Sequence, residues 1–112
     1  MNPRDLVAPV ADDILQMAAQ AEAERRLPER LMERLTQAGL FSIYTPSAFG
    51  GLELPLPVAL RVVEEVSRLD GSTGWTVALG FANDCFTSVL PDESAAQVLH
   101  NGSALIAGSP GF

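Results

Sequence analysis

One stretch, LDGSTGWTVALGFANDCFTSVLP at residues 69–91, constrains the fold of this 112-residue chain more than any other. It opens with the turn Asp70-Gly71 and a capping sequence, and apolar residues then recur at the spacing of an α-helix. These apolar residues are Trp75, Ala78, Leu79, Ala82, Cys85, Phe86, Val89 and Leu90. The pattern predicts a long helix with one strongly apolar side.

A strip of small and polar residues runs along another side of the same predicted helix. It consists of Thr76, Gly80, Asn83 and Thr87. A glycine inside a helix costs roughly 1 kcal/mol relative to alanine, so its presence needs a reason. Either another backbone packs closely against Gly80, or a ligand does, with the Asn83 amide beside it as donor and acceptor.

Composition indicates one small globular domain and argues against some partners. Hydrophobic residues make up 47% of the chain, and 14 acidic against 7 basic residues give a net charge of −7. Nucleic acid is therefore not an expected partner, because binding phosphates requires clustered cations. The four arginines between residues 25 and 34 alternate with glutamates, which predicts a solvated helix face with ion pairs.

The single cysteine and the single histidine predict neither a disulfide nor a metal site. Cys85 lies within the apolar helix, where a small buried filler is the favoured role over a reactive thiol. His100 has no neighbouring histidine or cysteine cluster to complete a set of metal ligands. No segment resembles a signal peptide or a membrane span, so a cytoplasmic location without a membrane partner is expected.

The rest of the chain predicts an all-α fold of about five helices. Residues 41–45 (FSIYT) alternate apolar and polar before a proline and are expected to be extended and half-buried. The following loop, at residues 47–57, is either shaped for a function or a long connection. Its Gly50-Gly51 is the only glycine pair able to bring backbone N–H groups close to a phosphate. The expected helices cover about residues 10–26, 28–38, 57–69, 70–90 and 91–101.

Nearly the whole chain also resembles a known family. The runs GLFSIYTPSAFGGL, VVEEVSRLDGSTGW, LPDESAAQVLHNG and ALIAGSPGF, separated by the apolar helix, are similar to the N-terminal helical domain of the acyl-CoA dehydrogenase family. This resemblance implies an orthogonal or up-down helical bundle over residues 1–103. Residues 104–112 would enter a β domain, with a first strand near 104–108.

Within that family, Trp75 resembles the branch of flavin-dependent monooxygenases. In several of these a histidine follows the tryptophan by eight residues and lies near the flavin, whereas this chain has Asn83 there. The difference weakens an assignment as a phenol hydroxylase and is compatible with members that oxidise sulfur or nitrogen. The resemblance makes Asn83 the candidate catalytic residue, near the flavin C4a. The residues expected to face substrate or flavin are Trp75, Thr76, Gly80, Asn83 and Thr87.

The implied function is the substrate-side domain of a flavin-dependent oxidoreductase, either an acyl-CoA dehydrogenase or a reduced-flavin-dependent monooxygenase. The intact enzyme would bind FAD or FMN and a small-molecule substrate, work with a flavin reductase or an electron-transfer flavoprotein, and form a homo-oligomer. This part alone is expected to bind no flavin and to catalyse nothing. The alternative is a non-catalytic helical interaction module that retains the fold. A domain built to be covered by others should expose an apolar patch and self-associate.

Overall fold

The protein is helical throughout the part that the structure describes. A computed structural model describes residues 2–84 and 89–99, and within these ranges there are five α-helices, one short 3-10 helix and no strand. The prediction of an all-α fold is confirmed. The elements are α1 (Pro3–Glu24), α2 (Glu29–Gln37), η1 (Ser47–Phe49), α3 (Leu56–Leu69), α4 (Gly71–Asp84) and α5 (Asp92–Leu99).

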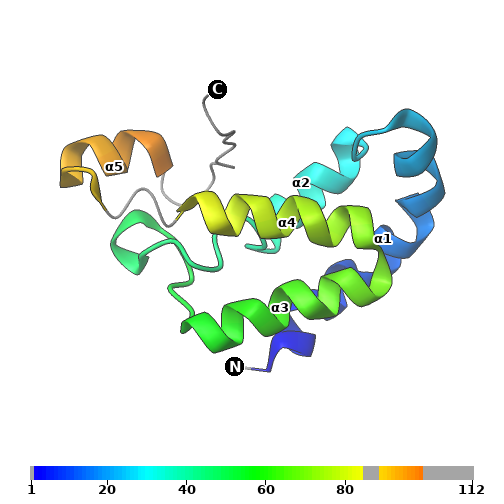
Figure 1. The fold of residues 1–112 in the computed structure, drawn as a ribbon, viewed down its shortest axis with the longest axis horizontal. Coiled ribbons are helices and arrows are strands. Elements are labelled where there is room, and N and C mark those ends of the chain that lie inside the picture. Colours follow the sequence, from blue (N-terminus) through cyan, green and yellow to red (C-terminus); the bar gives the residue numbers. More distant parts are fainter. Residues whose placement is uncertain (1, 85–88, 100–112) are drawn as a thin grey trace.

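The central unit is an antiparallel pair of helices, α3 and α4, joined by the single residue Asp70 (Figure 1). α1 packs across α3 and also reaches α4, and α2 packs on α1. Burying the apolar side chains between these helices is the main driving force for the arrangement. The largest fully buried hydrophobic side chains of the helices and of the loop after α2 are Val10, Ile14, Leu31, Leu35, Leu40, Ile43, Val62, Val66, Val77 and Leu99.

α1 begins earlier than the sequence predicted. Asn2 caps the helix by accepting a hydrogen bond from the Arg4 backbone N–H at 3.0 Å, and Pro3 occupies a first-turn position where proline is favourable. Pro9, expected to precede the helix, lies inside it. The expected start near residue 10 is therefore wrong, because a well-capped first turn carries the helix through an internal proline.

α2 is tied to α1 by a charged side chain. Arg34 donates to the Asp13 carboxylate at 3.0 Å and to the Pro9 carbonyl oxygen at 3.4 Å. This pairing crosses between helices, and within the described residues the alternating charges at positions 22–34 form no ion pair among themselves. The helix ends as predicted, since Gly39 has a φ of +83° in the left-handed region.

The predicted extended segment at residues 41–45 is an irregular run of turns and bends. It is not half-buried, because Phe41, Ser42, Ile43 and Thr45 are all buried. An alternation of apolar and polar residues predicts a strand with one face in water. Here the segment is covered by protein on both sides.

The loop that follows contains η1, a regular element that its prolines and glycines did not predict. The Gly50 N–H donates to the Ser47 carbonyl and the Gly51 N–H donates to the Pro46 carbonyl. Gly50 adopts a φ of +84°, and a side chain at Gly51 would collide with Thr45. The pair is therefore used for a tight turn, and its N–H groups are not available to a phosphate.

Some predictions concern residues outside those that the structure describes. They include the roles of Cys85, Thr87 and His100 and the strand near 104–108. Among the described helices, none combines the length and apolarity needed to cross a membrane. Residues 2–84 and 89–99 also contain no cluster of three or more histidine, cysteine or acidic residues suited to a metal ion.

Candidate functional site

The site predicted from the sequence lies on α4, whose first turn is fixed by a cap and a close helix contact. The Asp70 carboxylate accepts hydrogen bonds from the Thr73 N–H at 2.9 Å and from the Thr73 hydroxyl at 2.7 Å. Gly74 allows α3 to approach, since a β-carbon there would lie 2.7 Å from the Ser67 α-carbon. These contacts determine which side of α4 faces the fold.

The buried side of α4 is not the apolar side that the sequence suggested. Thr73 and Val77 are fully buried, and Phe81 and Asp84 are 8% and 4% exposed. Trp75 is 67% exposed and Leu79 is 43% exposed. The apolar stripe exists, but it points to solvent, while two polar side chains point inward.

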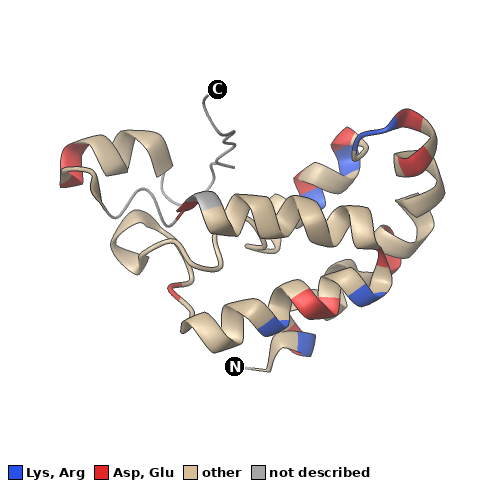
Figure 2. Ribbon diagram, viewed as in Figure 1, with Lys and Arg blue, Asp and Glu red and all other residues tan. Residues whose placement is uncertain are grey.

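α4 is also nearly free of charge, unlike the helices around it. Figure 2 shows acidic and basic residues on α1, α2 and α3, whereas α4 carries a single charged residue, Asp84 at its last position. Since Asp84 is buried, the solvent side of α4 presents no charge. A surface of this kind suits an apolar or aromatic partner better than a hydrated ion.

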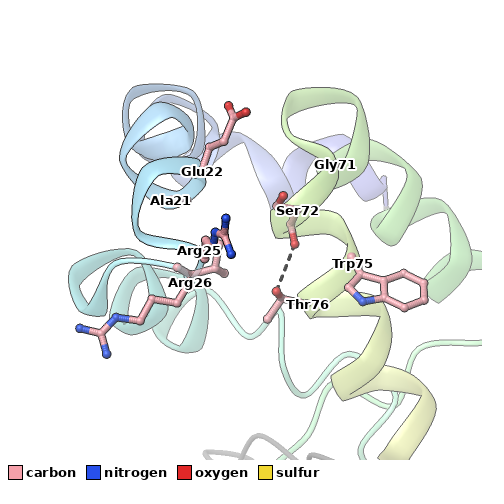
Figure 3. A pocket seen from close by; sticks show the side chains of 9 residues that line it. Ala21, Glu22, Arg25, Arg26, Gly71, Ser72, Trp75 and Thr76 are labelled. Atoms are coloured by element: carbon pink, nitrogen blue, oxygen red, sulfur yellow. Dashed lines mark hydrogen bonds between the residues drawn. The ribbon is translucent and has the colours of Figure 1, made fainter.

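The structure separates the predicted site residues into different faces. Thr76 is half-buried and donates its hydroxyl to the Ser72 carbonyl at 3.1 Å, and Gly80 is buried, as close packing would require. Trp75 points away from Thr76 (Figure 3), because consecutive residues of a helix are turned by about 100°. Asn83 lies in the last turn of α4, but its side chain is not described by the structure. Thr87 lies beyond α4, outside the described residues.

An open cleft of about 490 Å³ lies where the end of α1 meets the start of α4. Opposite charges, Glu22 and Arg25, share its α1 side, and Figure 3 shows Arg26 and Trp75 pointing away from each other. The cleft is lined by charged, hydroxyl and apolar side chains from both helices. Its lining comprises Ala21, Glu22, Arg25, Arg26, Leu27, Gly71, Ser72, Trp75 and Thr76.

The C-terminal end of α4 carries two contacts that sequence reasoning missed. The Thr45 hydroxyl donates to the Asp84 carboxylate at 2.5 Å, and the Tyr44 and Phe81 rings meet edge to face with centroids 5.2 Å apart. Burial raises the pKa of Asp84 above its ordinary value of 3.8, and the hydrogen bond from Thr45 opposes that rise. The available signal was spacing, because Asp84 follows Val77 by two helical turns and so shares its face.

Comparison with known proteins identifies the family. The family described as "Acyl-CoA dehydrogenase, N-terminal domain" matches residues 4–97. The chain belongs to the acyl-CoA dehydrogenase family and contains its N-terminal helical domain, so the resemblance noted in the sequence is confirmed.

Three relatives show where in the family the similarity lies. The indole-3-acetate monooxygenase of Acinetobacter baumannii is 25% identical over 89 residues, which cover 80% of this chain and 23% of the relative. The pigment production hydroxylase of a Rhodococcus species is 38% identical over 81 residues, covering 71% and 21%. The oxygenase component of p-hydroxyphenylacetate 3-hydroxylase of A. baumannii is 29% identical over 70 residues, covering 62% and 17%. The chain thus spans about a fifth of the length of these relatives.

Proposed function

We propose that this chain is the substrate-side domain of a flavin-dependent monooxygenase that receives reduced flavin from a separate reductase. The observation that carries the proposal is that a family match over residues 4–97 coincides with similarity to proteins named as monooxygenases and hydroxylases. One relative is named as an oxygenase component, which supports a separate source of reduced flavin. The longer protein is then expected to be a homo-oligomer that acts on a small molecule.

The described residues suit the aromatic ring system of a flavin and not its phosphate groups. The solvent side of α4 is uncharged and carries an exposed indole at Trp75, and such a surface can pack against an aromatic ring system. The Gly50 and Gly51 N–H groups are bonded within their own loop, so this loop offers no cradle for phosphates. We infer that the phosphates of FAD or FMN are held by other parts of the longer protein.

Asn83 is the proposed polar group of the site, and Thr76, Gly80 and Thr87 are proposed to lie along the same strip of the helix, with the buried Gly80 at the edge that faces the fold. When bound, the reduced flavin would supply the reaction with molecular oxygen. The role assigned to this chain is to shape the wall and to offer the Asn83 amide as a hydrogen-bond partner at the reacting region. An amide suits this role because it both donates and accepts while remaining uncharged.

The test is Asn83→Ala in the protein encoded by the longer reading frame that contains this chain. Loss of one polar contact at the reacting centre should lower turnover with reduced flavin and oxygen about 10²-fold and leave the melting temperature nearly unchanged. The control is Gln97→Ala, which removes an exposed amide from α5 and should change neither quantity.

Three outcomes would contradict the proposal. A destabilised but fully active Asn83→Ala protein would show that the amide satisfies a buried group and takes no part in the chemistry. A longer protein that passes electrons to an electron-transfer flavoprotein and does not react with oxygen would be a dehydrogenase. A reading frame with no flavin-binding part would instead favour the interaction module.

A further inference from the structure

The last turn of α4 is anchored from the side by the segment between α2 and α3. Thr45 and Asp84 are 39 positions apart in the sequence, yet their side chains share a 2.5 Å hydrogen bond. Both residues are buried, at 1% and 4% exposure. One turn earlier on the same face of α4, the Phe81 ring contacts the Tyr44 ring. Two adjacent residues of the segment therefore hold two turns of the helix.

The anchoring segment is itself held in one conformation. The Leu52 N–H donates to the Ser42 carbonyl at 2.9 Å, and the Leu54 N–H donates to the Ile43 carbonyl at 2.8 Å. The Thr45 carbonyl accepts from the Glu53 N–H at 3.0 Å. We call residues 41–54 the bracing loop. Because its two halves are cross-linked by these bonds, the Thr45 hydroxyl is presented to α4 from a stiff support.

A buried carboxylate such as that of Asp84 is unusual and needs a physical explanation. A buried carboxyl group is unfavourable compared with an apolar side chain of similar size, so packing alone would not select it. A hydroxyl–carboxylate hydrogen bond is short and roughly twice as strong as a bond between neutral groups. It is also directional, so it defines a position in a way that an apolar contact does not. Asp84 directly follows Asn83, the residue proposed above to face the reacting centre.

We propose that Asp84 is a positioning residue that, through Thr45, fixes the last turn of α4 and the backbone of Asn83 against the bracing loop. Its importance for turnover rests on the proposed function, but the positioning itself is a property of the 112-residue chain. Neither Thr45 nor Asp84 touches substrate in this proposal. Both act by holding the element that carries Asn83.

The experiment is amide hydrogen–deuterium exchange on the 112-residue chain. Thr45→Val keeps the shape of the side chain and removes the hydroxyl, and it should raise exchange at residues 81–84 by about 10- to 100-fold, the effect of losing one hydrogen bond to a charged group. Exchange in α1 and α3 should change much less. Thr45→Ser retains a hydroxyl and should restore slow exchange at the end of α4.

The matched control is Ser42→Ala in the same bracing loop. Ser42 is also buried, and its hydroxyl donates to the Gly39 carbonyl at 3.2 Å, so it does not bond to α4. This variant should leave exchange at residues 81–84 as it is in the parent chain. If Thr45→Val does not fold, Asp84→Asn provides the second variant, which should give a smaller rise at the same residues.

Two results would overturn the proposal. One is a rise at residues 81–84 that is no larger for Thr45→Val than for Ser42→Ala. The other is a rise spread evenly over α1, α3 and α4, which would make the bond a contribution to overall stability only. A local rise in the short chain with unchanged turnover of the longer Thr45→Val protein would support the positioning and contradict its importance for turnover, while absence of any turnover in the unaltered longer protein would contradict the proposed function alone.

Discussion

The two sides of α4 differ from those of an ordinary surface helix, because polar groups lie on the buried side and large apolar side chains lie in solvent. The side against the fold carries the polar groups of Thr73 and Asp84 beside Val77, and the side in solvent carries Trp75 and Leu79. The inward side chains of Thr73 and Asp84 are hydrogen-bonded to Asp70 and Thr45 respectively, which lowers the cost of burying them. Burial of Val77 and Phe81, close backbone contacts and specific hydrogen bonds together set the buried side, whereas the larger number of apolar side chains on the other side does not.

Because the other side of α4 is buried, its apolar side remains exposed to solvent. It carries no charge, and its largest side chain, Trp75, is 67% exposed. The function proposed above uses this surface as a wall for an aromatic substrate or cofactor. Substitutions on each side of α4 in turn test this difference.

The largest effect is expected from Gly74→Ala on the buried side. The new β-carbon would lie 2.7 Å from the Ser67 α-carbon, so α3 and α4 must separate or tilt. Overpacking of this kind should lower the free energy of unfolding by about 2 to 3 kcal/mol. Urea unfolding measures the change. The control is Gly71→Ala, which meets nothing within 4 Å and should be neutral or slightly stabilising; equal losses at the two glycines would refute the close contact.

A smaller, pH-dependent effect is expected from Asp84→Asn. Since burial raises the folded-state pKa of Asp84, the fold disfavours the charged carboxylate. That penalty is absent below the unfolded value of 3.8 and is complete above the raised folded-state pKa. The variant should therefore gain stability relative to the parent chain as pH rises through this window. Unfolding midpoints across a pH series test the sign, and a difference that is flat or falls with pH would contradict it.

The smallest effect on stability is expected on the solvent side. Trp75→Gln removes an exposed indole and should change the free energy of unfolding by no more than about 0.5 kcal/mol. It should nevertheless reduce the self-association expected of the parent chain, because the apolar surface of α4 is smaller. Light scattering over a concentration series measures this. Leu15→Gln, which removes an exposed leucine from α1, is the control, and an equal reduction by both variants would argue against a special role for α4.

The helical elements could be predicted from the sequence wherever the signal was local. Gly39 marked the end of α2, and the apolar spacing after Pro57 predicted α3 to within one residue of its observed start. Caps, left-handed glycines and 3.6-residue periodicity act over a few neighbours, so they can be recognised without knowing the fold. The start of α1 was missed because the Asn2 cap outweighed the presence of Pro9.

The buried side of α4, in contrast, is set by tertiary contacts. Periodicity correctly grouped Trp75 with Leu79, but two sides of one helix are equivalent until a neighbour is placed against one of them. That neighbour is α3, admitted by Gly74, together with a loop whose Thr45 lies 39 positions before Asp84. Contacts between residues so far apart in the chain leave no periodic trace in the sequence, and their geometry arises only when the helices pack.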